Sequence, residues 1–251
     1  MNNSTSKRSA RWPTTWPADS FRPGPTGLLI LTLAGVSGVV LAVGLALLWP
    51  SLTGSPTHTP PIVGAILVQL VLEVAVVAII IAALPRLSGF SLGELGFRPL
   101  RTSDVTYGVV GAIAMLIVVQ GSSALVEALT HQVHEQQVVE LFKHIRAPGT
   151  VGLFAVFAIV LAPIAEETIF RVFVFNLGMR YGGFWTGAVA SGLCFGLAHW
   201  DKYAFLPLAL GGMLLCYVYY RSGNAFASMI SHGIFNAVTL LAIVFAPKLA
   251  Q

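Results

Sequence analysis

The sequence predicts an all-α fold, a polytopic membrane helix bundle of about seven transmembrane helices, with a range of six to eight. Of the 251 residues, 56% are apolar and only 10% are Asp, Glu, Lys or Arg, whereas about a quarter of an average soluble domain is charged. The charged residues separate long uncharged stretches, each near the about 20 residues with which a helix crosses a bilayer. Transmembrane β-strands would instead alternate over about 10 residues.

Seven apolar stretches follow one another along the chain. A Pro-rich segment at 11–25 precedes the first, and an uncharged loop at 51–60 separates the first from the second. The first stretch exceeds the about 7–15 apolar residues of a signal-peptide core and has no obvious small-x-small cleavage site, so we expect a retained span. The predicted spans are residues 27–49, 61–85, 105–129, 150–178, 183–200, 203–220 and 224–246.

Aromatic residues support the predicted positions of the span ends, because tryptophan and tyrosine prefer the bilayer interface. The aromatic residues at predicted span ends are Trp49, Trp185, Trp200, Tyr217, Tyr219 and Tyr220.

Between the third and fourth spans, residues 130–148 mix apolar with charged side chains and predict an amphipathic helix on the outer surface.

The Lys and Arg residues predict the orientation of the bundle. Cytoplasmic loops are enriched in these residues, so we expect the side that carries more of them to be cytoplasmic. That side includes the N-terminus, and the C-terminus then lies on the outer side. With alternating topology, one side carries Lys7, Arg8, Arg11, Arg22, Arg86, Arg98, Arg101, Arg180 and Arg221, and the other carries Lys143, Arg146, Lys202 and Lys248.

We expect a cytoplasmic tail at residues 1–26 and a single integral-membrane domain at residues 27–251. The composition excludes a disordered chain, a secreted disulfide scaffold and a cytosolic enzyme. The net charge of +4 does not indicate a nucleic-acid partner, because the basic residues flank apolar segments. Both cysteines, Cys194 and Cys216, fall inside predicted spans, where free cysteine behaves as a small apolar residue.

The fourth span carries an unusual density of charge. Glu166, Glu167 and Arg171 lie within six residues, and each charge at the bilayer centre costs about 3 kcal/mol unless the bundle pairs it. At about 100° per residue, Glu167 lies about 40° from Arg171 and Glu166 about 140° from it. We therefore expect Glu167 to pair with Arg171, and Glu166 to face a cavity as a free carboxylate. A purely structural Glu–Arg pair explains the motif equally well when it is taken alone.

Polar groups on later spans favour a reactive site. At about 1.5 Å per residue from the predicted cytoplasmic ends, Glu166, His199, His232 and Asn236 fall at overlapping depths of about 12–24 Å. His232 and Asn236 are four residues apart on one helix face, so both could donate to one substrate oxygen. Either histidine alone is more commonly an interhelical hydrogen-bonding group. The overlap of all four predicts a shared site in the region 160–240.

Three motifs in order make this region similar to the CAAX protease and bacteriocin-processing (Abi) family of intramembrane glutamic endopeptidases. Glu166-Glu167-x-x-x-Arg171 resembles its first motif, Phe195-x-x-x-His199 its second and His232-x-x-x-Asn236 its third. The run from Leu210 through Gly223 to His232 also resembles the family. Val172 follows the motif arginine, where many members have glycine, so the local helix packing is expected to differ.

The resemblance implies that the chain hydrolyses a peptide bond with water as the nucleophile. Glu166, aided by His199, would be the general base, and His232 and Asn236 would stabilise the oxyanion. Glu167 and Arg171 would shape the cavity, with Phe195 packed beside it. No cofactor is expected, because a zinc site built from Glu166, His199 and His232 lacks a two-histidine helix motif. The expected partners are the bilayer and a peptide or protein substrate, including lipidated chains, in a bacterial plasma membrane.

A non-enzymatic membrane protein is the alternative. It would be an immunity or partner-binding protein, or a proton-linked transporter that uses Glu73 and Glu166 as relay carboxylates. The sequence shows no paired broken helices and no repeated halves, which weighs against a transporter. Glu73, which lies in the middle of the second span, is then most simply interpreted as an interhelical hydrogen-bonding group.

Overall fold

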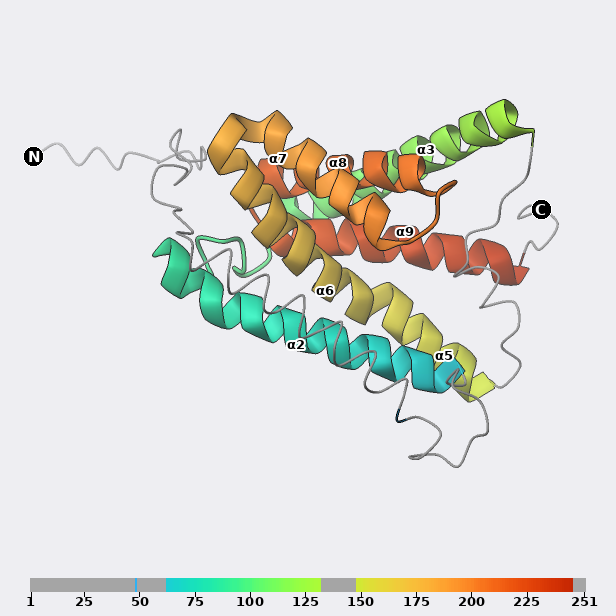
Figure 1. The fold of residues 1–251 in the computed structure, drawn as a ribbon, viewed down its shortest axis with the longest axis horizontal. Helices are drawn as coiled ribbons and strands as arrows, with labels where there is room; N and C mark the ends of the chain where they lie inside the picture. The colour runs from blue at the N-terminus through green and yellow to red at the C-terminus, as the bar shows by residue number, and fades with distance from the viewer. Residues whose placement is uncertain (1–47, 49–61, 132–147, 246–251) are drawn as a thin grey trace, which may run out of the picture.

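The structure, a computed structural model, describes residues 62–131 and 148–245 together with residue 48, and these residues form a helical bundle (Figure 1). No β-strand occurs among them, which confirms the predicted all-α class for this part of the chain. The tail at 1–26 lies outside the described residues, and so do the predicted span at 27–49, apart from residue 48, and the predicted amphipathic helix at 130–148, apart from residues 130, 131 and 148.

Six of the predicted spans correspond to helices, with ends that differ by a few residues. The fourth and fifth form one continuous helical run, which two π-helical segments, η2 and η3, interrupt. The elements are α2 (Ile62–Ser88), α3 (Thr102–Thr130), α5 (Pro148–Val156), η2 (Phe157–Leu161), α6 (Ala162–Glu167), η3 (Thr168–Phe175), α7 (Asn176–Ala198), α8 (Phe205–Ser222) and α9 (Ala225–Phe245).

Four helical runs in the described part are long and apolar enough to cross a membrane: Leu67–Arg86, Thr102–Thr130, Pro148–Ala198 and Ala225–Phe245. The predicted polytopic membrane bundle is therefore confirmed as a class, while the number of seven spans stays a prediction. α8 is not among the four, since its last two turns carry tyrosines, an arginine and a serine.

The run Pro148–Ala198 holds two predicted spans because it is kinked at Gly182–Gly183. A straight helix of 51 residues would be about 75 Å long, more than twice the hydrocarbon thickness of about 30 Å. Gly183 has a φ of 73°, a left-handed conformation that glycine adopts without a steric penalty. The chain turns there, so the second half of α7 packs against α8. The predicted break between residues 178 and 183 lies at this kink.

The helix through the fourth predicted span is not uniformly α-helical. The six-residue α6, which carries the two glutamates, lies between η2 and η3, where each N–H reaches a carbonyl five residues back instead of four. Pro163 contributes to the break at η2, because proline has no N–H with which to continue the helical hydrogen bonds. Such π-helical insertions are frequent at functional sites.

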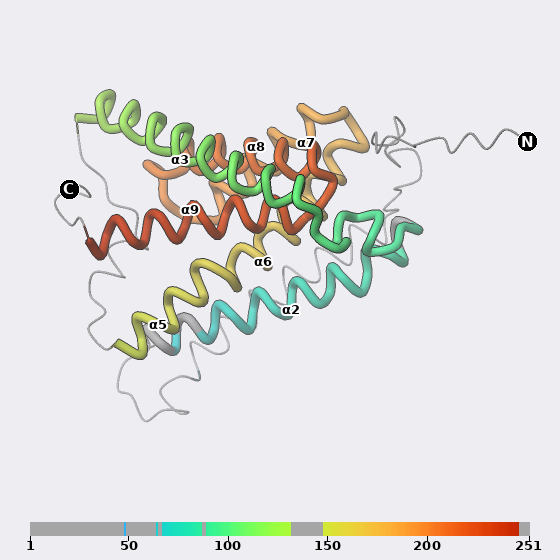
Figure 2. The backbone as a smooth tube through the Cα atoms, turned by 180° about the vertical axis from the view of Figure 1, so that it is seen from behind, coloured from blue at the N-terminus to red at the C-terminus, as the bar shows by residue number. Residues whose placement is uncertain are grey.

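α9 lies at the centre of the described bundle. It contacts α3 on one side and η2 and α6 on another, and it also packs against α8 (Figure 2). α2 packs against η2, α6 and η3 at the opposite edge from α3. Side chains on α9 can therefore contact residues of α3, α8, η2 and α6.

Buried polar contacts join two connections at one end of the bundle. Asn224, between α8 and α9, donates its amide to Asp104 Oδ2 at 3.0 Å, and Arg98, between α2 and α3, donates to the Ser222 carbonyl at 2.6 Å. The topology predicted from the sequence puts both connections on one side of the membrane, and their adjacency is consistent with it. Which side is cytoplasmic stays a prediction.

A glycine allows the close approach between α9 and η2. A Cβ added at Gly233 would lie 2.6 Å from the Ile159 carbonyl oxygen, well inside ordinary contact distance. Because backbone atoms cannot move aside like the end of a flexible side chain, any larger residue must push the two helices apart. Gly233 follows His232 directly, so this contact also fixes the position of that imidazole.

We expect Gly233→Ala to lower the free energy of unfolding by about 1–3 kcal/mol, the usual cost of overpacking. Gly152→Ala is the matched control, because a Cβ at Gly152 in α5 would meet no atom within 4 Å. It should be neutral or stabilising, since alanine favours the helix. Denaturant titration in detergent micelles measures both, and equal stability of the two variants would contradict the close packing.

Candidate active site

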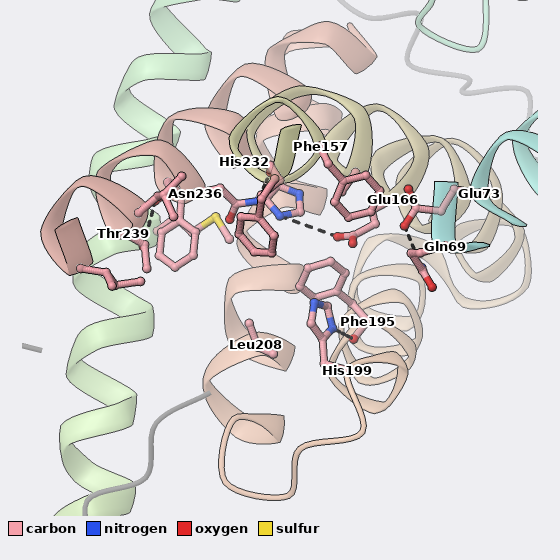
Figure 3. Close-up of a pocket in the computed structure, with 17 residues that line it drawn as sticks. Gln69, Glu73, Phe157, Glu166, Phe195, His199, Leu208, His232, Asn236 and Thr239 are labelled. Carbon is pink, nitrogen blue, oxygen red and sulfur yellow. Dashed lines mark hydrogen bonds and ion pairs between the residues drawn. The ribbon is translucent and has the colours of Figure 1, made fainter. Parts of the chain in front are cut away.

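A cavity of about 220 Å³ lies among α2, the run from α5 to α6, α7, α8 and α9 (Figure 3). The four side chains predicted from the sequence to meet, Glu166, His199, His232 and Asn236, all line it. Glu166 lies on α6 and His199 at the C-terminal end of α7, two distant parts of one helical run, and His232 and Asn236 lie on α9. The remaining wall is mostly apolar and aromatic, as is usual for a site that binds part of a larger ligand.

The two adjacent glutamates have different surroundings, as the helix geometry predicts. Glu167 is fully buried, and its Oε1 lies 3.0 Å from Arg171 Nη1. The Glu166 side chain is 21% exposed and reaches the cavity. The predicted pairing of Glu167 with Arg171 is therefore confirmed, and Glu166 is the carboxylate available to a ligand.

Glu167 also holds His232, a contact that the sequence did not reveal. His232 Nδ1 lies 3.0 Å from the same Glu167 Oε1 that faces Arg171. A carboxylate oxygen only accepts, so Nδ1 carries the hydrogen and donates it. The other ring nitrogen, Nε2, lies 3.7 Å from Glu166 Oε2. That separation is longer than a direct hydrogen bond, so Nε2 remains available to a ligand.

Phe195 packs beside the charged residues, as the sequence led us to expect. The Arg171 guanidinium lies 4.6 Å from the centre of the Phe195 ring, which favours a cation. The same ring lies 4.7 Å from the ring of His199 and 5.6 Å from that of His232, measured between centroids. Arg171 also donates to the Gly212 carbonyl at 3.3 Å. Phe195 thus separates the arginine from the cavity and contacts both imidazoles.

The hydrogen bond of His199 fixes its tautomer. Nδ1 lies 2.8 Å from the carbonyl oxygen of Phe195, one turn earlier on α7. Because a carbonyl accepts only, Nδ1 carries the hydrogen, and in the neutral ring Nε2 has a free lone pair. His199 can therefore accept a proton or a hydrogen bond at Nε2.

Asn236 satisfies a carbonyl that the π-helical segment leaves without a backbone donor. The Ala162 N–H bonds to Phe157 O, and the next position in that pattern, Pro163, has no N–H to offer Ala158. Asn236 Nδ2 donates to the Ala158 carbonyl at 2.7 Å. One hydrogen of its amide is thus used, and the second N–H and Oδ1 remain. The sequence did not reveal this contact, and it leaves one amide hydrogen for the predicted donation to a substrate oxygen.

Glu73 contradicts the interpretation given to it from the sequence. Among the described residues its hydrogen-bond partner is on its own helix and not on another: Gln69 Nε2, one turn earlier on α2, donates to Glu73 Oε1 at 2.9 Å. Both side chains line the same cavity as Glu166. Sequence reasoning missed this because residues 61–85 carry no family motif, and the packing of α2 on α6 and η3 depends on tertiary contacts.

Two serines and two cysteines near the three motifs are the other side chains that could carry a nucleophile. Ser191 and Ser231 are buried and donate to the Phe170 and Gly108 carbonyls at 2.7 Å each. Cys194 and Cys216 are both free thiols. Within the described ranges, no three His, Cys, Asp or Glu side chains form a group that could hold a metal ion.

A comparison with family models matches residues 148–238 to the family described as "Type II CAAX prenyl endopeptidase Rce1-like". The match confirms the resemblance to the CAAX protease and bacteriocin-processing family over the segment that contains all three motifs. It supports a membrane-embedded CAAX-type endopeptidase, which is a peptide hydrolase acting on a peptide or protein. Neither the curated proteins nor the solved structures gave a match.

The buried ion pair predicts a strong effect of Arg171 on stability. Arg171→Met leaves the buried Glu167 without its cation, and we expect the free energy of unfolding to fall by about 3–5 kcal/mol. Adding Glu167→Gln should recover part of that loss, since the unpaired charge is then gone. Denaturant titration in detergent micelles measures the free energy of unfolding of the wild type, the two single variants and the double variant.

Arg221→Met is the control for loss of an arginine, because Arg221 is exposed and bonds Tyr217 on its own helix. It should change the free energy of unfolding by at most about 0.5 kcal/mol. Additive effects of Arg171→Met and Glu167→Gln would contradict the coupling of the two residues.

Proposed function

We propose that the chain is an intramembrane endopeptidase that hydrolyses a peptide bond with a water molecule activated by Glu166. One observation carries the proposal: Glu166, His199, His232 and Asn236 line a single cavity, while Glu167 and Arg171 pair behind it. Two neighbouring glutamates thus have separate functions, one structural and one available for chemistry.

Glu166 takes a proton from water as the water oxygen adds to the substrate carbonyl carbon. His199 supports this step, because its Nε2 lone pair can accept the second hydrogen of the same water and orient it. General base catalysis of this kind contributes about 100-fold to 10,000-fold to a rate. The water, and no side chain, is the nucleophile, so no covalent acyl-enzyme forms.

His232 and Asn236 stabilise the negative charge that develops on the substrate oxygen. Since Nδ1–H of His232 is used by Glu167, the ring donates to the substrate oxygen from Nε2 only as an imidazolium, and Glu167 and Glu166 lie on its two sides. When Glu166 gains the water proton, negative charge moves to the oxyanion, and the imidazolium keeps a counter-charge. The second amide hydrogen of Asn236 is the other donor.

The substrate class proposed is the one that the matched family's description names, a prenylated CAAX chain. A site inside a membrane bundle with a largely apolar wall suits a peptide that carries a lipid or an apolar segment. A farnesylated peptide that ends in a CAAX sequence is therefore the first probe, and total cellular peptides are the second.

We expect Glu166→Gln to lower the rate of cleavage of the farnesylated probe by about 100-fold or more, because the amide cannot accept the water proton. Glu127→Gln is the matched control: it also removes an acid from a membrane helix, but Glu127, on α3, does not line the cavity. Purified protein in bilayers or detergent is assayed for the released tripeptide. Comparing cellular peptides between the wild type and Glu166→Ala extends the test to natural substrates.

The proposal fails if Glu166→Gln cleaves the probe at the wild-type rate. A transporter or partner-binding protein would be favoured if Glu166→Gln kept biological activity while Glu73→Gln lost it. Thermal unfolding of both variants separates loss of activity from loss of fold.

EDTA or phenanthroline should leave the cleavage rate unchanged within about twofold, because the proposed base and oxyanion donors are side chains of the protein itself. The rate is measured before and after dialysis against each chelator. Loss of activity that added zinc restores would favour a metalloprotease and overturn this mechanism.

A further inference from the structure

Glu73 is the acid in this cavity that the motifs do not include. Glu73 is only 7% exposed. Its Oε1 accepts a hydrogen bond from Gln69, and its Oε2 is buried without a hydrogen-bond partner among the described residues. Figure 3 shows Glu166 between His232 on one side and Glu73 with Gln69 on the other. Glu73, with one carboxyl oxygen unpartnered among the described residues, therefore lines the cavity next to the proposed base.

The other buried acids of the described part have strong partners, and Glu73 does not. Glu167 faces Arg171 and His232, and Asp104 accepts from the Asn224 amide and the Arg101 backbone N–H. No ion pair reaches Glu73 within the described ranges. An ionised carboxylate that is buried with one neutral amide for a partner is costly, whereas a protonated carboxyl group is not.

The charged groups around Glu73 support the same protonation state. α2 packs on η2, α6 and η3, which present Glu166, Glu167 and Arg171, and the cavity adds His199 and His232. Arg171 is already paired with Glu167, and His232 faces Glu167 and Glu166. Among these groups no positive charge is therefore left over for Glu73, and the neighbouring Glu166 carboxylate disfavours a second negative charge there.

We propose that Glu73 is a further catalytic residue, the general acid that protonates the departing amine. This inference rests on the proposed peptidase function. In the first step, Glu166 takes a proton from water, and the water oxygen bonds to the carbonyl carbon. In the second, the O–H of Glu73 gives its proton to the amide nitrogen as the carbon–nitrogen bond breaks.

The two steps conserve protons and need no reagent other than water. The carbonyl forms again as the electron pair of the broken bond leaves with the nitrogen, which gives a carboxylic acid and an amine. Glu166 then holds a proton, and Glu73 has lost one. Transfer of that proton from Glu166 to Glu73 across the cavity restores both groups, and the sum is the addition of one water to one amide.

The geometry favours Glu73 over the imidazoles for this step. Nδ1–H of His199 is bonded to the Phe195 carbonyl, and Nδ1–H of His232 is bonded to Glu167. His232 Nε2 is assigned to the oxyanion, and His199 Nε2 to the water. Gln69 holds Oε1 of Glu73, so the hydrogen lies on Oε2, the oxygen without a partner.

The test compares an amide with an ester. The probes are the farnesylated CAAX peptide and its depsipeptide analogue, in which the scissile amide is an ester. An alkoxide leaves with less need for a proton than an amide nitrogen does. We expect Glu73→Gln to lower kcat for the peptide by about 100-fold or more and kcat for the ester by less than about tenfold.

The ratio of the two rates in one preparation does not depend on the fraction of folded protein. Glu127→Gln, the matched control, should leave both rates and their ratio unchanged. Glu166→Gln should lose both reactions, and if it loses neither, the proposed function itself is wrong. If Glu166→Gln loses both while Glu73→Gln keeps the peptide rate or lowers both rates equally, this inference alone is wrong.

Infrared spectroscopy gives a readout that needs no substrate. Wild-type protein in bilayers at neutral pH should show the C=O stretching band of a protonated carboxyl group, and Glu73→Gln should lose it. Glu127→Gln should keep the band. An identical band in the wild type and in Glu73→Gln would overturn the assignment of the proton to Glu73.

Discussion

The candidate site depends on one carboxylate, that of Glu167. Its Oε1 contacts Arg171 one turn later and His232 on α9, both at 3.0 Å. This oxygen therefore fixes the imidazole against the helix that carries Glu166, and it sets which nitrogen of His232 faces the cavity. The Glu167–Arg171 ion pair matches two of the three charges that the fourth span carries within six positions, and the Glu166 side chain reaches the cavity. This arrangement explains how the span tolerates such residues in a bilayer.

The π-helical segments connect this charge arrangement to the backbone. η2 and Pro163 leave the Ala158 carbonyl without a helical donor, and Asn236 supplies one. Gly233 lets α9 approach η2 closely enough for that contact. Residues 232, 233 and 236 therefore act together: the first bonds to Glu167, the second removes a steric obstacle, and the third completes the backbone hydrogen bonding. The spacing of the third motif thus has a structural reason beside the catalytic one.

Much of the fold could be predicted from the sequence, because long apolar stretches and glycine breaks are local signals. The Glu167–Arg171 pair also follows from helix geometry, since four residues separate them. The π-helical segments could not be predicted by the same rule, because they depend on contacts with α9. Glu73 was misinterpreted for a related reason: periodicity says which face of α2 carries it but not what packs there. The gathering of Glu166, His199, His232 and Asn236 was predicted from depth alone, while the hydrogen-bond directions that define their chemistry required the structure.

The contrast between Glu167 and Glu73 shows how one residue type can serve opposite purposes in the same bundle. Glu167 has two cationic or donating partners, so its charge is stabilised and it organises its neighbours. Glu73 has one neutral partner, and its other oxygen has no hydrogen-bond partner among the described residues, so a proton on Glu73 avoids an unpaired buried charge. Glu166 lies between these extremes, since it is partly exposed and 3.7 Å from an imidazole. A graded series of environments, from fully paired to unpaired, is the physical condition under which one acid can keep its charge, one can accept a proton and one can give a proton away.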